Sequence, residues 1–185
     1  SFPYNPDSSI ESYGFDDYDG EVEIEVGPEY AIADSLIHPL TFLSDPTNEK
    51  KTIHGVYLGE IANIATDTII LYCHGNRDHL DFYWPRIKLL ANVGGKNRYG
   101  VLAMDYRGFG LSEGPANEEG LYEDVDACIL WLNKMGLTED RLVIYGFSLG
   151  SAPATELTAN PRTLQPSKLM LESCFASDDV FVEDA

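Results

Sequence analysis

The sequence has no run of 18 or more apolar residues, and basic side chains are scarce throughout its 185 residues. A membrane-spanning helix needs about 20 consecutive apolar residues, so we expect no transmembrane segment. Only 12 Lys and Arg oppose 31 Asp and Glu, which gives a formal net charge of −19. Such a surface repels phosphate backbones, so a nucleic acid is not expected as a partner.

Cysteine is also scarce: Cys73, Cys128 and Cys174 each lie in an apolar stretch. A small, odd number favours buried free thiols over a disulfide framework, although a bridge between Cys73 and Cys174 stays open. No Cys and His residues have the spacing of metal ligands, so no metal or other cofactor is expected. Free thiols suit a cytoplasmic protein, whereas a start at Ser1 suits a processed envelope or periplasmic one. Localisation and oligomeric state are therefore left open.

Basic residues are absent from the first 34 positions, which carry ten Asp and Glu and four tyrosines. We interpret residues 1–34 as an acidic N-terminal arm that wraps the surface of a single core domain, residues 35–185. A partner-binding or calcium-binding stretch is the alternative. The segment 16–20 supports calcium binding weakly, because it lacks the rest of a calcium loop.

The remainder of the chain changes from antiparallel strands to strands that alternate with helices. Alternation and turn residues predict the first strands at 21–26, 35–43 and 52–58. Short apolar runs predict further strands at 68–73, 100–104, 142–145 and 168–171, and helical spacing predicts helices at 80–93 and 117–135. This order predicts an α/β fold with a mostly parallel, doubly wound sheet and an antiparallel N-terminal part.

The pentapeptide Gly146–Gly150 has the pattern G-x-S-x-G, between an apolar strand and a small-residue stretch that can begin a helix. In this context the pattern describes a tight turn that holds a serine hydroxyl clear of the sheet. Glycine is needed on both sides because a Cβ there would clash with the crossing backbone. We therefore predict that Ser148 is a nucleophile.

A second pentapeptide, Gly110–Gly114, has the same pattern around Ser112. No strand leads directly into it, and Pro115 follows it where a helix would have to begin. We interpret this segment as a glycine-rich loop and expect no nucleophile at Ser112.

A serine nucleophile also needs hydrogen-bond donors for the negatively charged oxygen that forms during acyl transfer. The amide of Leu149 lies at the start of a helix, where backbone N–H groups have no partner within the helix. The strand at 68–73 leads into His74-Gly75-Asn76, and the amide of Asn76 can point at the same spot. We predict that these two amides form an oxyanion hole, and that the His74 side chain only braces its loop.

Together these segments resemble the α/β-hydrolases, specifically small serine hydrolases related to lipase-like esterases and acylaminoacyl-peptidase-like enzymes. The matching segments are His74–Asn76, Asp105–Gly114, Gly146–Gly150 and Leu171–Ser173, in the family's order across residues 52–175. The resemblance implies a sheet of α/β-hydrolase type covering its strands one to six, so that residues 35–185 would form the N-terminal two-thirds of the core.

The resemblance also assigns roles to individual residues. It implies that Ser148 accepts the acyl group and that Asn76 and Leu149 donate to the oxyanion. The loop 105–114 would form one wall of the cleft, with Asp105 and Arg107 stabilising the loop rather than serving as the catalytic acid.

The sequence departs from the family at the triad, whose acid and histidine follow the serine in chain order. All four histidines, His38, His54, His74 and His79, precede Ser148. Three explanations stay open: a fragment whose triad acid and histidine lie outside these residues, an inactive relative, or an unusual base such as His79. Glu172 ends the last strand, and we interpret it as a carboxylate that ties down a loop.

The expected function is that of a serine hydrolase acting on a small acyl substrate, a carboxylic ester or a related thioester or amide, through an acyl-enzyme on Ser148. One alternative is a catalytically inactive binding protein of the same fold. A second is an acyl-peptide or prolyl-type peptidase, although residues 1–50 are too few for the propeller that such peptidases usually carry.

Overall fold

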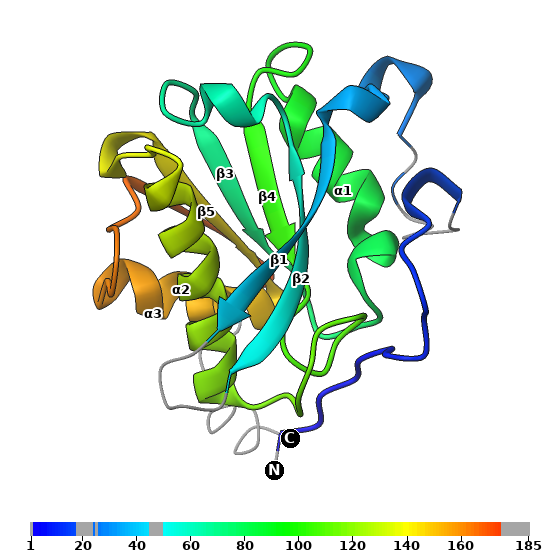
Figure 1. Cartoon of the computed structure of the whole chain (residues 1–185), viewed down its shortest axis with the longest axis vertical. Helices are drawn as coiled ribbons and strands as arrows, with labels where there is room; N and C mark the ends of the chain where they lie inside the picture. Colours follow the sequence, from blue (N-terminus) through cyan, green and yellow to red (C-terminus); the bar gives the residue numbers. More distant parts are fainter. Residues whose placement is uncertain (1, 18–23, 25, 45–49, 175–185) are drawn as a thin grey trace.

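The computed structural model describes residues 2–17, 24, 26–44 and 50–174, which form a sheet with helices on both faces (Figure 1). The strands follow the order β1-β2-β4-β3-β5-β6 across the sheet. Their bounds are β1 Ile37–Ser44, β2 Lys51–Leu58, β3 Ile69–Cys73, β4 Gly100–Met104, β5 Leu142–Phe147 and β6 Lys168–Glu172. The pairs β1–β2 and β2–β4 are antiparallel, and β3 pairs in parallel with β4 and β5, as β5 does with β6. This confirms the predicted fold class.

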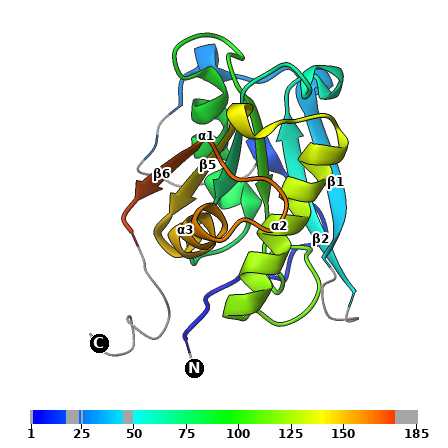
Figure 2. The ribbon, with the colours of Figure 1, turned by 90° about the vertical axis from the view of Figure 1, so that its left-hand side faces the viewer.

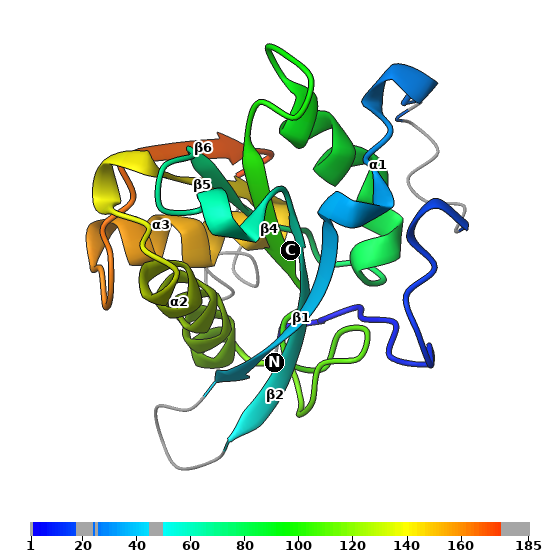
Figure 3. The same ribbon diagram turned by 45° about the horizontal axis from the view of Figure 1, so that its top comes forward.

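Helix α1 (Leu80–Asn92) covers one face of the sheet, and α2 (Glu118–Lys134) and α3 (Ser151–Ala159) cover the other (Figures 2 and 3). Short 3₁₀ turns lie between these elements: η1 Phe15–Asp17, η2 Pro28–Tyr30, η3 Asp34–Leu36, η4 Ile61–Asn63, η5 Glu139–Arg141 and η6 Ser148–Gly150. Every residue of β3 and β4 is buried, because helices cover both faces of the sheet there.

The elements form where local chemistry predicts them. Helix α2 begins where the side chain of Asn117 accepts a hydrogen bond from the amide of Gly120 at 2.8 Å, which satisfies one of the unpaired amides of the first turn. Strands β1 to β6 and helices α1 and α2 lie within about two residues of their expected bounds. The expected strand at 21–26 lies largely outside the described residues.

The expectation of buried thiols holds for two of the three cysteines. Cys73 and Cys128 are buried, but Cys174 is exposed, and all three are free. The prediction of burial is wrong for Cys174, which follows β6, a strand with a neighbour on one side only among the described residues. Within the described ranges, no helix combines the length and apolar character that crossing a membrane requires.

The carboxyl ends of the parallel strands all lie along the same side of the sheet, which we call its carboxyl edge. The segments after β3, β4 and β5 all begin there, and these are the segments that carry His74–Asn76, Asp105–Gly114 and Ser148. In open α/β sheets, this edge is where ligands bind.

Candidate active site

The chain makes a sharp turn at Ser148, between β5 and α3. Ser148 has φ of 49°, in the left-handed region that non-glycine residues rarely adopt. Its side chain is half-buried, and its carbonyl accepts a hydrogen bond from the Ser151 hydroxyl at 2.5 Å. The turn thus holds a serine in a strained conformation at the start of a helix, as the pattern predicts.

Backbone contacts explain both glycines of this turn. A Cβ on Gly146 would lie 2.6 Å from the carbonyl oxygen of Gly150, and a Cβ on Gly150 would overlap the carbonyl group of Cys73. Neither position can hold a side chain unless the backbone moves. The second contact also shows that the turn packs directly on the end of β3.

The segment His74–Asn76 lies beside the Ser148 turn. Cys73 and Gly146 are partners in the parallel pairing of β3 with β5, so both segments leave the sheet from adjacent points. A Cβ on Gly75 would lie 3.1 Å from the ring of Phe147, the residue before the serine. Among the described residues, none accepts a hydrogen bond from the backbone amide of Asn76.

The His74 ring is buried and fully engaged. Its Nδ1 lies 2.8 Å from the carbonyl oxygen of Gly75, and its Nε2 lies 2.8 Å from Oδ1 of Asp105. The ring also stacks on Tyr83, with 4.6 Å between centroids and 19° between planes. These contacts support the interpretation of His74 as a brace, because both ring nitrogens lie within hydrogen-bond distance of oxygen atoms of the protein.

Asp105 joins three segments that are distant in sequence. Besides His74, its carboxylate accepts hydrogen bonds from the Tyr13 hydroxyl at 2.6 Å and from the amide of Leu80 at 3.1 Å. Proximity to this carboxylate and, above all, burial raise the pKa of Tyr13 well above its usual value, so Tyr13 stays a neutral donor. The bonds of Asp105 to His74, Tyr13 and Leu80 tie separate segments together, which fits the loop-stabilising interpretation of this residue.

Arg107 connects the loop after β4 to helix α2. Its guanidinium donates to Glu123 at 2.7 Å and to Asp124 at 2.8 Å, and its backbone amide donates to Asp124 at 2.7 Å. All three residues are buried, and the single guanidinium offsets part of the charge of the two carboxylates. This network anchors the wall of the site, as the loop-stabilising interpretation of Arg107 expects.

Ser112, the serine of the second pentapeptide, has no free hydroxyl. It is buried, its Oγ donates to the carbonyl of Asp105 at 2.6 Å, and it accepts from the amide of His54 at 2.9 Å. The hydroxyl therefore ties the loop to β2, which supports the interpretation of this segment as a structural loop.

His79 and Glu172, two further residues considered for catalysis, are held in other contacts. The His79 ring is fully buried, with its nitrogens 3.8 Å from Asp7 and 3.9 Å from Asp81, and this burial argues against a role as base. Arg86 donates to both oxygens of Glu172, at 2.9 and 3.1 Å.

Glu172 also accepts a hydrogen bond from the Tyr145 hydroxyl at 2.7 Å. Partial burial raises the pKa of Glu172, but the bonds from Tyr145 and Arg86 outweigh it and leave the pKa below its usual value. The Arg86 guanidinium lies 4.2 Å from the ring centre of Phe147. Glu172 thus braces the neighbourhood of the Ser148 turn, in agreement with the structural interpretation.

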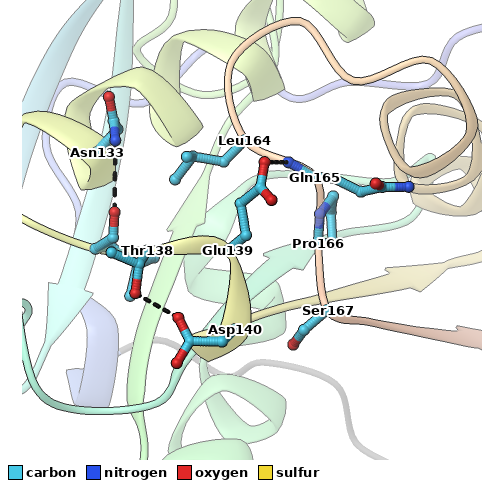
Figure 4. A pocket seen from close by; sticks show the side chains of 9 residues that line it. Asn133, Thr138, Glu139, Asp140, Leu164, Gln165, Pro166 and Ser167 are labelled. Carbon is cyan, nitrogen blue, oxygen red and sulfur yellow. Dashed lines mark hydrogen bonds between the residues drawn. The ribbon is translucent and has the colours of Figure 1, made fainter.

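A broad depression of about 620 Å³ lies elsewhere, beside η5 and the start of β5 (Figure 4). Its polar groups largely satisfy one another: Glu139 accepts from the amide of Gln165 at 3.1 Å, and Thr138 donates to Asp140. Because it is at the amino end of β5, it lies away from the Ser148 turn. In the described part of the chain, no group of three or more His, Cys, Asp or Glu side chains is placed to hold a metal ion.

The sequence analysis did not predict that the N-terminal arm contacts the loops beside the Ser148 turn. Tyr13 contacts Asp105, and the backbone of residues 3–7 contacts the loops after β3 and β4. The tyrosines of the arm were the only local signal, and they do not indicate a partner 92 positions away.

The fold is that of the α/β-hydrolases. The solved structure of the Pyrococcus furiosus esterase Pf2001 superposes with a TM-score of 0.57, covering 86% of this chain and 55% of that one at 18% identity. At this identity, the likeness concerns the fold alone. A family model for the alpha/beta hydrolase fold matches residues 68–169, more than half of the chain, and the protein belongs to this family. The resemblance inferred from the motifs is thereby confirmed.

Two curated relatives match over shorter stretches. The protein YfhR of Escherichia coli K12 is 29% identical over 109 residues, which cover 58% of this chain and 37% of YfhR. The lysophosphatidylserine lipase ABHD12 of Danio rerio is 37% identical over 121 residues, which cover 61% of this chain and 29% of that protein. The match thus spans less than two fifths of the length of either relative.

Proposed function

We propose that this protein is a serine hydrolase that cleaves a carboxylic ester, or a related thioester or amide, through an acyl-enzyme on Ser148. The observation that carries the proposal is the left-handed φ of 49° at Ser148, in a turn whose glycines lie against backbone. A strained conformation of this kind costs on the order of 1–3 kcal/mol, and such strain concentrates at functional sites.

The chemistry follows from the placement of the turn. Oγ of Ser148 attacks the substrate carbonyl carbon, and a general base takes its proton. The amides of Asn76 and Leu149 stabilise the oxyanion until the alcohol, thiol or amine leaves with a proton, and water then releases the acid by the same steps. We assign the base and the triad acid to no residue of the described chain, since His74 and His79 are buried in other contacts.

Two kinds of support favour ester hydrolysis as the first activity to test. The fold matches a protein named as an esterase, and one relative is named as a lysophosphatidylserine lipase. Both names concern hydrolysis of an acyl compound, so a small acyl substrate is the class that we propose.

Covalent labelling tests the proposal directly. A fluorophosphonate probe should label the full-length protein, and peptide mapping should place the probe on Ser148. Ser148→Ala should abolish the label, whereas the matched variant Ser112→Ala should keep it. An unlabelled protein with an intact fold by circular dichroism would favour an inactive binding protein instead.

A second assay distinguishes ester substrates from peptide-like amide substrates. We expect the full-length protein to hydrolyse p-nitrophenyl esters faster than aminoacyl anilides. The reverse preference would indicate a peptidase and would overturn the ester assignment while leaving Ser148 as the nucleophile.

A further inference from the structure

The N-terminal arm holds the side chain of Asn76 by hydrogen bonds on both sides. The backbone amide of Asn5 donates to Oδ1 of Asn76 at 2.8 Å, and Nδ2 of Asn76 donates to the carbonyl of Pro3 at 3.0 Å. Within the described residues these are the hydrogen bonds of that side chain. The side chain of Asn76 is therefore oriented by residues more than 70 positions away.

The arm also connects the two loops that border the Ser148 turn. The amide of Asp7 donates to the carbonyl of Asp78 at 3.0 Å, and Pro6 forms a parallel bridge with Asp78. The carbonyl of Asp7 in turn accepts from the amide of Gly110 at 2.8 Å. Residues 6 and 7 thus link the segment after β3 to the segment after β4.

Contacts on both sides of residues 3–7 anchor the arm. Phe2 is buried in the main hydrophobic cluster. Further along, the amides of Gly14 and Phe15 donate to the Asp81 carboxylate at 2.8 and 2.6 Å, and the Phe15 ring lies 4.5 Å from that of Trp84. An arm anchored at both ends can restrain the loop that it crosses, because its own position is set elsewhere.

The loop that the arm crosses needs such restraint. Residues 74–77 belong to no helix or strand, and within them Asn76 is only half-buried and Arg77 is exposed. The amide of Asn76 stabilises an oxyanion only if it stays within hydrogen-bond distance of the reacting oxygen. A displacement of about 1 Å can cost about 100-fold in rate.

We propose that residues 3–7 of the arm are a positioning element of the oxyanion hole, acting through the side chain of Asn76. This inference rests on the proposed function. Among the described residues, the hydrogen bonds that residues 3–7 make with other segments go to the loops after β3 and β4, and none goes to Gly146–Gly150.

The test removes one hydrogen bond without altering Asn76. Asn5→Pro deletes the backbone donor to Asn76, and Asn5→Ala is the matched control because it retains that N–H. In the full-length protein, we expect Asn5→Pro to lower kcat for a p-nitrophenyl ester about tenfold while KM changes less than about twofold. Asn5→Ala should stay within about twofold of wild type in both constants. An unchanged kcat in Asn5→Pro would overturn the inference.

Hydrogen–deuterium exchange supplies a readout that does not depend on turnover. The peptide covering residues 74–79 should exchange faster in Asn5→Pro than in wild type, and Asn5→Ala should match wild type. Unchanged exchange in Asn5→Pro would overturn the positioning role. Faster exchange with unchanged kcat would also overturn it, because the contact would then be only structural.

A second variant covers the case in which Asn5→Pro does not fold. Asn76→Ala removes both hydrogen bonds from the loop side and retains the backbone amide, and we expect the same loss of kcat and the same faster exchange. Failure of the proposed function gives a different result: wild type would then neither turn over esters nor react with the fluorophosphonate.

Discussion

The two pentapeptides of this chain have the same sequence pattern, G-x-S-x-G, but one lies between a strand and a helix and the other lies in a loop. Gly146–Gly150 ends a strand and begins a helix, and its serine is half-buried with φ of 49°. Gly110–Gly114 lies in a loop, and its serine is buried with both functions of its hydroxyl in use. The pattern alone therefore does not make a nucleophile; the strand and helix around it do.

The final glycine of each pentapeptide shows why the two differ. A Cβ on Gly150 would overlap the backbone of Cys73, whereas a Cβ on Gly114 would lie 3.1 Å from the flexible side chain of Lys51. The first glycine is required by the packing of one strand end on another. The second is favoured mainly by its φ of 85°.

The largest difference should appear in catalysis. We expect Ser148→Ala to lower kcat for ester hydrolysis on the order of 10⁶-fold, as loss of a serine nucleophile does, because no other hydroxyl can take its place. The free energy of unfolding should change by less than about 1 kcal/mol, since the hydroxyl is not part of the core. Steady-state kinetics and urea denaturation of the full-length protein measure both. Substantial turnover in Ser148→Ala would contradict the assignment.

The glycines should differ next, in stability. Gly150→Ala should destabilise the protein by about 3 kcal/mol or more, because the new methyl group meets rigid backbone. Gly114→Ala should cost about 1–2 kcal/mol, the strain of an L-residue in a left-handed conformation. Chemical denaturation of the two variants measures both losses of unfolding free energy. Equal losses would show that the contact at Cys73 does not distinguish the two turns.

Ser112→Ala should affect stability and leave the chemical step intact. The change removes the acceptor of the His54 amide and the donor to the Asp105 carbonyl, which should cost about 1–3 kcal/mol. Fluorophosphonate labelling of Ser148 should proceed at the wild-type rate. A variant of wild-type stability that has lost labelling would reverse the roles of the two serines.

The smallest effect concerns the carboxylate beside the Ser148 turn. The pKa of Glu172 is lowered in the folded protein, so this group stabilises the fold above its unfolded pKa, and the contribution is lost as pH falls through the lower, folded pKa. Glu172→Gln should therefore weaken the fold near neutral pH by less than about 1 kcal/mol, with the difference vanishing in acid. Thermal unfolding between pH 7 and pH 3 tests this, and a difference that grows in acid would refute it.

Much of the fold was predictable because its signals are local. Buried parallel strands appear as short apolar runs, and Asn117 marks the start of α2 by its capping side chain. The turn at Ser148 was predictable for the same reason, since strand, glycines and helix start lie within one short segment. The exposure of Cys174 was not predictable, because the burial of a residue that follows a strand depends on the neighbours of that strand in the sheet.

By itself, the sequence determined the alternation of strands and helices and the position of the sharp turn, because dihedral preferences and apolar spacing act between near neighbours. Only the tertiary structure decided which serine hydroxyl is occupied, which histidine is buried against a carboxylate, and which arm residues hold Asn76. Those outcomes depend on groups such as Tyr13 and Asp105, separated by 92 positions, and no local pattern encodes a partner at that distance.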